Sequence, residues 1–144
     1  MYNPAAGFPG VVVELAYTDL PTAINWLTRV FGFRELLRQT VDGTVHHADL
    51  DTGGGVVMLA KAGDRLTTPP AGVPAAAQLI VWVDNVDKHY ATSVSEGAQV
   101  LHEPRDKPWG LRQYLAHDHE NHLWEFTEHI RDVPAHDWGA TTRT

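Results

Sequence analysis

The chain has no cysteine among its 144 residues and only 11 Lys and Arg residues against 18 Asp and Glu residues. Without cysteine it can form no disulfide framework, thiolate nucleophile or zinc-thiolate site, which agrees with a reducing compartment. The formal net charge is −7 and the basic residues form no run. Because nucleic-acid phosphates require a basic surface, this charge argues against nucleic acid and favours a neutral or cationic ligand.

The chain also lacks an apolar run of the roughly 18 residues that a membrane span requires. Its first ten residues have neither a basic region nor a long apolar core, so the sequence predicts no export signal and a cytoplasmic protein. Its only serines, Ser93 and Ser95, fall on a predicted helix, which argues against a Ser-His-Asp triad. The "TGGG" segment joins two predicted strands and lacks the following helix that a phosphate-binding loop needs.

The strongest positive signal is an internal repeat. Four turn and boundary residues recur at offsets of 65 to 67 positions: Asp19 with Asn85, Gly32 with Gly97, Gly43 with Gly110, and Asp51 with Asp118. Repeats at a fixed period indicate duplicated structural units. A single unit of about 60 residues can barely bury a core, so the two units are expected to fold together.

Each unit is predicted to contain one strand, one helix and three further strands. In the first, a strand over 11–20 precedes a helix that begins near Asp19 and Pro21 and ends at Gly32. The second has a strand over 77–84, a helix over 86–96, and strands near 98–103, 110–117 and 121–128. The units span about 10–61 and 77–128. Segment 62–76, with three of the nine prolines, is predicted to be a linker, and 129–144 a C-terminal extension.

The two successive β-α-β-β-β units predicted for this chain resemble the vicinal oxygen chelate superfamily. The resemblance depends on four motifs: "TDL" and "VDNV" before the helices, "FGF" after the first helix and "DHENHLWEF" at the end. This superfamily includes glyoxalase I, bleomycin-resistance proteins, fosfomycin-resistance enzymes and extradiol dioxygenases. "VHHADL" and "EPRDKPWGLRQYLAHDHENHLWEF" are similar to its glyoxalase/bleomycin-resistance branch. The resemblance covers about 11–128. It implies an α+β fold in one domain, 1–128, with curved mixed sheets around a shared cavity and helices outside.

The resemblance also implies four metal-ligand positions, two in each unit. They fall on Val12, Met58, Gln78 and Glu125. Only Glu125 is a good ligand for a hard divalent cation, since Val12 has no donor atom and Met58 offers a soft thioether. We therefore expect no metal and no other cofactor. A shifted strand register leaves one alternative, a divalent metal held by Glu14, Gln78 and Glu125.

Several polar and aromatic residues have two interpretations. Glu14 either faces a wet cavity or forms a salt bridge, for example with Arg112. Glu125 is either a cavity carboxylate or a rim carboxylate paired with an arginine. Trp82 shares a strand face with Gln78, although a core-filling role is the usual one for a tryptophan.

The histidines of "HDHENH", His117, His119 and His122, either collect a metal or form a solvated turn, and turn chemistry favours the second. His46 and His47 are neighbours on a strand and point to opposite faces, so at most one can enter a cavity, with His47 the preferred candidate.

Three functional hypotheses follow. The leading one is a binding protein without a catalytic metal that encloses a small organic ligand, flat or cationic and antibiotic-like. Its cavity is lined by Val12, Glu14, His47, Met58, Gln78, Ile80, Trp82 and Glu125. The second is an enzyme of the lyase, isomerase or dioxygenase type, metal-dependent or using Glu125 as catalytic base. The third is a structural or interaction protein. A homodimer is expected, since relatives commonly pair or exchange units.

Overall fold

The computed structural model describes residues 9–143 and contains two four-stranded mixed sheets, each with one helix. The first unit comprises β1 (Val13–Tyr17), α1 (Leu20–Phe31), β2 (Arg34–Val41), β3 (Thr44–Asp51) and β4 (Val56–Lys61). The second comprises β5 (Gln78–Trp82), α2 (Val86–Ser95), β6 (Gln99–Asp106), β7 (Leu111–His117) and β8 (Leu123–His129). The predicted α+β class and tandem βαβββ units are confirmed.

The two sheets have equivalent strand orders, β1-β4-β3-β2 and β5-β8-β7-β6. In each, the first and last strands of the unit pair in parallel and the remaining pairs are antiparallel. The connection between the two parallel strands of each unit runs through the helix and the two intervening strands, which supplies the long crossover that parallel pairing requires. This order leaves β1 and β5 as edge strands of their own sheets.

Both helices begin and end where the sequence predicted. The Asp19 carboxylate accepts a hydrogen bond from the Thr22 backbone N–H at 3.1 Å, which caps α1. The Asn85 side chain accepts one from the Lys88 backbone N–H at 2.9 Å, which caps α2. Gly32 ends α1 with a φ of 74°, a left-handed conformation that glycine adopts without strain.

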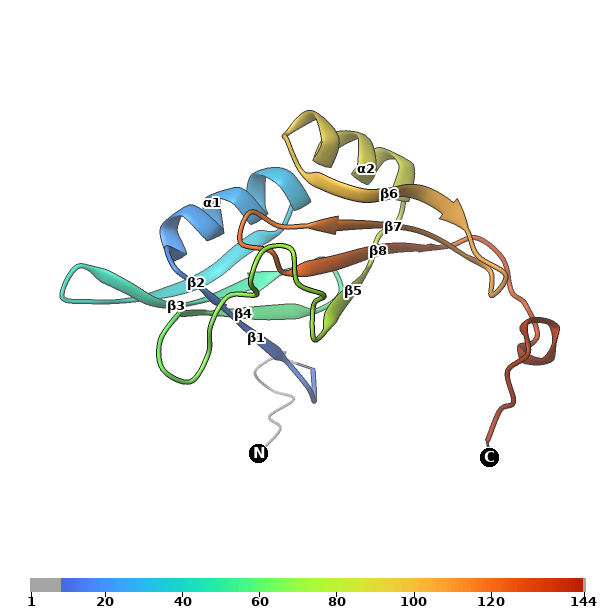
Figure 1. Ribbon diagram of the computed structural model, residues 1–144, viewed down its shortest axis with the longest axis horizontal. Coiled ribbons are helices and arrows are strands. Elements are labelled where there is room, and N and C mark those ends of the chain that lie inside the picture. Colours follow the sequence, from blue (N-terminus) through green and yellow to red (C-terminus); the bar gives the residue numbers. More distant parts are fainter. Residues whose placement is uncertain (1–8, 144) are drawn as a thin grey trace.

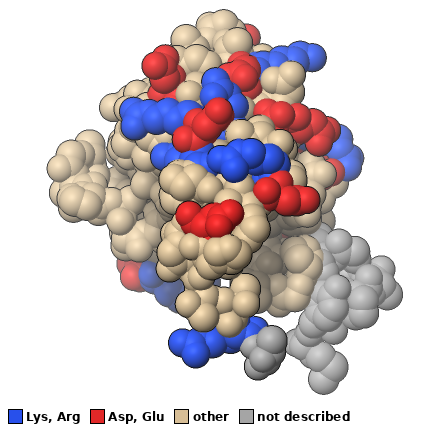
Figure 2. Space-filling model, turned by 90° about the vertical axis from the view of Figure 1, so that its right-hand side faces the viewer, with Lys and Arg blue, Asp and Glu red and all other residues tan. Residues whose placement is uncertain are grey.

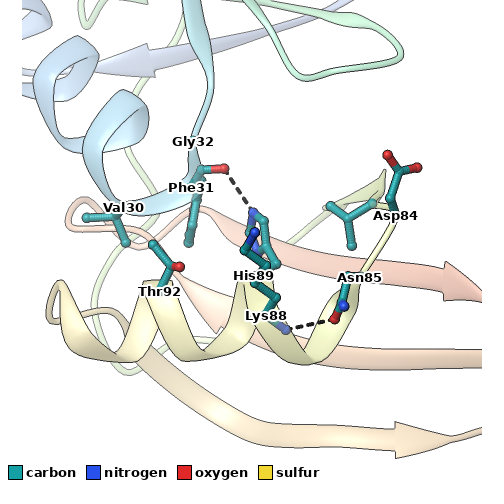
Figure 3. A pocket seen from close by; sticks show the side chains of 9 residues that line it. Val30, Phe31, Gly32, Asp84, Asn85, Lys88, His89 and Thr92 are labelled. Atoms are coloured by element: carbon teal, nitrogen blue, oxygen red, sulfur yellow. Dashed lines mark hydrogen bonds between the residues drawn. The ribbon is translucent and has the colours of Figure 1, made fainter.

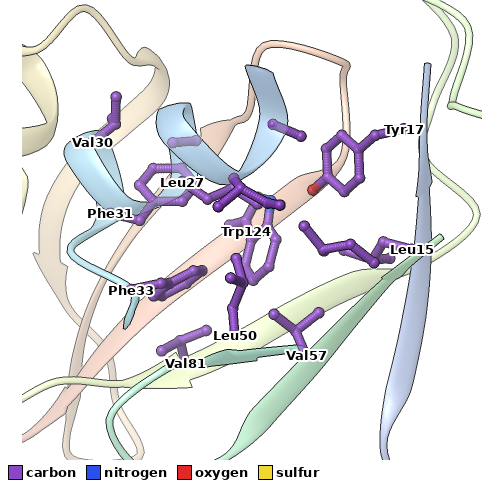
Figure 4. Close-up of a cluster of buried hydrophobic side chains, with 14 of the residues drawn as sticks. Leu15, Tyr17, Leu27, Val30, Phe31, Phe33, Leu50, Val57, Val81 and Trp124 are labelled. Atoms are coloured by element: carbon purple, nitrogen blue, oxygen red, sulfur yellow. The ribbon is translucent and has the colours of Figure 1, made fainter. Parts of the chain in front are cut away.

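The hydrophobic core joins the two units (Figure 4). Leu27 and Phe31 of α1 point toward Trp124 of β8, and Leu50 and Val57 of the first sheet approach from the opposite side. Alternate residues of the strands contribute to this core, and both helices lie on the same side of the sheets (Figure 1). Each sheet therefore has a helix-covered face and a face without helices, which we call the helix-free face.

The turn between β7 and β8 docks on the first unit. The Tyr17 hydroxyl donates to the Asp118 carboxylate at 2.6 Å, and the Thr18 backbone N–H donates to Glu120 at 2.9 Å. His122 is buried with its Nε2 2.7 Å from the Ala16 carbonyl oxygen, and the His119 ring stacks on Trp26. The prediction that this turn is solvated is therefore wrong: it carries contacts that hold the units together.

The remaining segments are the linker and the C-terminal extension. Segment 62–76 has no helix or strand and crosses from β4 to β5. β8 continues to His129, and the extension after it contains one short 3-10 helix, Ala135–Trp138. The ring of Trp138 lies 6.0 Å from that of Trp109, next to the turn before β7.

No helix within residues 9–143 has the length and apolarity needed to cross a membrane. Acidic and basic side chains intermix over much of one end face of the molecule, so that face presents no large basic surface for nucleic acid (Figure 2). The first eight residues, on which most of the prediction about export rests, lie outside the described residues. The cytoplasmic location remains a prediction.

Candidate functional site

A pocket of about 610 Å³ lies between the edge strands of the two units. β1 forms one wall, the first residues of β5 and β8 form a second, and the linker from Leu66 onward forms a third. The walls are mainly apolar. Small-molecule sites in proteins typically have this size and an apolar lining with few polar groups.

Two polar side chains that the sequence singled out, Glu14 of β1 and Gln78 of β5, line this pocket. They come from different units, and the Glu14 carboxylate and the Gln78 amide make no side-chain hydrogen bond to any other residue of 9–143. Glu14 is half-buried and Gln78 is exposed, so both polar groups remain accessible to a polar group of a ligand. The pocket is therefore the strongest candidate site on the described part of the chain.

Two cationic or potentially cationic groups flank Glu14. The Arg65 guanidinium lies 3.6 Å from one carboxylate oxygen, and His47 Nδ1 lies 3.7 Å from the other. Both distances exceed ordinary hydrogen-bond lengths. The predicted partner Arg112 is not involved, because it pairs with Asp87 and Asp106 at 3.0 and 2.8 Å. That part of the sequence prediction is wrong.

Met58 and His47 share the helix-free face of the first sheet with Glu14. In the strand register Glu14 lies beside Met58, and Met58 lies beside Asp49. The His47 ring has its Nε2 2.7 Å from the Asp49 carboxylate, so its other nitrogen is directed to Glu14. His47 rather than His46 thus lies near the candidate site.

Gln78, Ile80 and Trp82 alternate along the helix-free face of the second sheet. Ile80 and Trp82 are 53% and 57% exposed, whereas Val81 between them is buried. Trp82 therefore does not fill the core. The three residues form a row that leads from the pocket along an open sheet surface.

Glu125 lies on that same surface beside Ile80, but it does not line the pocket. Its carboxylate accepts a hydrogen bond from the Gln113 amide at 2.9 Å, and this amide also donates to Thr127. Its hydrogen-bond partner is thus an amide, and no arginine forms an ion pair with it among the residues described.

The four chelate positions do not fit a hard divalent cation. Val12 precedes β1 and does not line the pocket, Met58 offers sulfur, and only Glu125 provides a carboxylate. In the alternative set, Glu14 and Gln78 share the pocket but Glu125 lies outside it. Within residues 9–143, no three His, Asp or Glu side chains gather in an arrangement able to hold a metal ion. Absence of a metal remains a prediction.

A second pocket, of about 360 Å³, lies on the helix side, between the end of α1 and the start of α2 (Figure 3). In it His89 places Nε2 2.9 Å from the Phe31 carbonyl oxygen and Nδ1 2.6 Å from the Tyr114 hydroxyl. Burial lowers the pKa of His89, while the Phe31 carbonyl opposes this shift. The contact with Phe31 links the helices of the two units and the contact with Tyr114 links α2 to β7, so we assign His89 a structural role.

Sequence reasoning missed Arg65 and the linker wall of the pocket. Nothing local to "AGDRLTTPP" indicates that Arg65 reaches Glu14, because the contact depends on the path of the linker across β1. The proline content of the segment was the only available signal. It indicated a connecting segment that contributes no regular structure.

Comparisons with known proteins match a region that spans both units of the repeat. Residues 11–126 match the family described as the Glyoxalase/Bleomycin resistance protein/Dioxygenase superfamily. TioX from Micromonospora sp. ML1 is a similar solved structure, with 56% identity over 85% of this chain and 99% of that chain, at a TM-score of 0.72. No curated protein matches this chain.

More distant solved structures share the fold. A glyoxalase/bleomycin resistance protein/dioxygenase from Nocardioides has 19% identity, covers 85% of this chain and 84% of its own, and has a TM-score of 0.61. A mutant of the fosfomycin resistance protein FosX from Listeria monocytogenes, solved with Mn(II) and a dihydroxypropylphosphonic acid, has 18% identity. The match to FosX covers 83% of this chain and 89% of that chain, with a TM-score of 0.61.

Proposed function

The chain belongs to the Glyoxalase/Bleomycin resistance protein/Dioxygenase superfamily, and on this premise we propose that it binds a small organic cation without a catalytic metal. The ligand occupies the pocket between the two units. The observation that carries the proposal is that two polar side chains without a side-chain hydrogen bond to any other residue of 9–143, Glu14 and Gln78, line a pocket with otherwise mainly apolar walls. An apolar body buried against those walls gains hydrophobic stabilisation, while its charged group meets the carboxylate.

The charge of the protein supports a cation. With a formal net charge of −7, the chain attracts cations at long range and repels anions. Glu14 is a carboxylate, which accepts hydrogen bonds and donates none. A ligand with an ammonium or another N–H donor therefore complements the pocket better than a carboxylate or phosphonate does.

Sequestration rather than turnover is the function that this geometry favours. The catalytic alternative relies on Glu125 as a base, but Glu125 lies outside the pocket and is already hydrogen-bonded to Gln113. A general base must reach the proton that it removes. Metal-assisted catalysis is not favoured either, because the residues at the four chelate positions do not suit a hard divalent cation.

Calorimetry with two probes of equal shape tests the proposal. Phenyltrimethylammonium is a cation, and tert-butylbenzene is its neutral counterpart. We expect the cation to bind more tightly, and Glu14→Gln to weaken its binding by up to about fivefold, because a quaternary ammonium donates no hydrogen bond and gains only the attraction between the partly exposed charges. Glu103→Gln removes an exposed carboxylate on β6 and serves as the matched control. Equal binding of both probes, or an unchanged affinity in Glu14→Gln, contradicts the proposal.

We also propose that the chain forms a homodimer through its helix-free faces. Large apolar side chains on the strands remain exposed, including Leu37 at 47%, Ile80 at 53% and Trp82 at 57%. Several large exposed apolar side chains on one side of a protein commonly mark a contact site. A second copy of the chain covers the row formed by Gln78, Ile80 and Trp82 and thereby shields the ligand from solvent.

A further inference from the structure

The Arg65 guanidinium lies beside the Glu14 carboxylate, where the cationic group of the proposed ligand is expected to bind. The Arg65 Nη2 atom lies 3.6 Å from Glu14 Oε1, and the Arg65 side chain is 85% exposed. An exposed ion pair at this distance is weak. Arg65 is thus close enough to neutralise the carboxylate and loosely enough held to leave it.

The segment that carries Arg65 has few attachments to the body of the protein. At its start the Ala62 backbone N–H donates to the Tyr17 carbonyl, and a turn joins the Gly63 N–H to the Leu66 carbonyl. Further along, the Asn121 amide donates to the Pro69 carbonyl at 3.3 Å. The segment belongs to no helix or strand. Arg65 can therefore move away without breaking a sheet or helix.

We infer that Arg65 is a specificity-determining residue that stands in for the cationic group of the ligand at Glu14. This inference rests on the proposed function. Ligand binding exchanges one cation for another: the Arg65 guanidinium withdraws into solvent as the ligand's cationic group takes its place. A neutral molecule of the same shape has no charge with which to replace Arg65. The guanidinium thus prevents Glu14 from being left unpaired before the ligand binds.

The exchange makes a specific prediction for binding of phenyltrimethylammonium. Arg65→Gln removes the guanidinium that competes with the ligand for Glu14. The affinity of the protein for phenyltrimethylammonium therefore rises by up to about fivefold, the equivalent of a weak exposed ion pair. Arg65→Lys keeps the competing charge and leaves the affinity near that of the wild type. Binding of tert-butylbenzene is the same in all three proteins. Arg131→Gln removes one positive charge on the C-terminal extension and controls for the general change in net charge.

A second measurement tests the contact without any ligand. Amide hydrogen exchange of the peptide covering 62–68 is compared in the wild type and in Glu14→Gln. If Glu14 holds Arg65, loss of the carboxylate speeds exchange in this peptide and leaves the peptides of α1 and α2 unchanged. Addition of phenyltrimethylammonium to the wild type has the same effect on this peptide.

The outcomes separate the two ideas. Tighter cation binding in Arg65→Gln than in Arg131→Gln supports the exchange. If the cation binds the wild type and Glu14→Gln weakens it, but Arg65→Gln does not differ from Arg131→Gln, the exchange is overturned and the proposed function stands. If the cation binds neither the wild type nor Arg65→Gln, both ideas are overturned.

Discussion

Tyr17 and Asp118 are 101 residues apart in the sequence, yet the Tyr17 hydroxyl donates a 2.6 Å hydrogen bond to the Asp118 carboxylate in the buried junction of the two units. Asp118 also accepts hydrogen bonds from the Trp124 indole and from the backbone N–H groups of Glu120 and His122. Burial, followed by the charge of Asp118, raises the pKa of Tyr17 well above its ordinary value. Four donors thus stabilise one buried carboxylate.

The first prediction concerns this junction. Tyr17→Phe leaves the buried carboxylate one donor short, so it lowers the free energy of unfolding by about 1–3 kcal/mol. Thr18→Ala removes an exposed hydrogen bond to Glu120 in the same turn and costs less. Urea denaturation followed by circular dichroism measures both. Equal losses in the two variants contradict the assigned role of Tyr17.

A second prediction concerns pH and His89. Burial lowers the pKa of His89 from the value of 6.5 that it has in the unfolded chain. Between these two pKa values the unfolded chain binds more protons, so stability falls as pH decreases through this window. Replacing His89 with Gln removes the titrating group, so the unfolding free energy of the variant depends less on pH just below 6.5. Denaturation series from about pH 7.5 downward measure the slope, and parallel curves for the two proteins contradict the prediction.

The third prediction separates two equivalent glycines. Gly43 and Gly110 occupy corresponding hairpin turns with φ values of 77° and 87°. A Cβ atom added to Gly43 would have no neighbouring atom within 4 Å, whereas one added to Gly110 would clash with the Arg131 carbonyl. Both alanine variants carry the cost of left-handed backbone, about 1–2 kcal/mol, but only Gly110→Ala also displaces the C-terminal extension. Its tryptophan fluorescence changes, since Trp109 and Trp138 then separate, while that of Gly43→Ala does not.

The fourth prediction concerns metal. Elemental analysis of protein purified without chelator is expected to show less than stoichiometric Mn, Fe, Co, Ni and Zn, because Val12 and Met58 offer no hard ligand. Added Mn²⁺ or Zn²⁺ is expected to leave the melting temperature unchanged. One bound ion per chain that is lost in Glu125→Gln overturns the prediction and revives the metalloenzyme alternative.

A fifth prediction tests the homodimer. Light scattering at micromolar concentration is expected to give twice the mass of one chain, and Trp82→Glu to shift the population toward monomer, since it places a charge in an apolar contact. Val94→Glu changes an exposed apolar residue of α2 on the opposite side and leaves the dimer intact. A wild-type monomer, or the same shift in both variants, argues against this interface.

The sequence by itself determined the architecture, because that information is local and repeated. Asp19 and Asn85 cap helices, Gly32 ends one, and Gly43 and Gly110 permit the hairpin turns, each through hydrogen bonds or backbone angles set within a few residues. Two copies of this pattern at a constant offset were enough to predict both units and their family. Alternation along β5 likewise predicted that Gln78, Ile80 and Trp82 share a face.

Only the tertiary structure decided which of these residues meet. The pocket joins Glu14 with Gln78 because the edges β1 and β5 lie on either side of it and the linker covers the gap, and neither arrangement is encoded in a strand pattern. For the same reason Glu14 approaches Arg65 rather than Arg112, and the "HDHEN" turn is buried against Tyr17 rather than solvated. Contacts between residues distant in sequence depend on how the two units pack, and that packing is a property of the whole core.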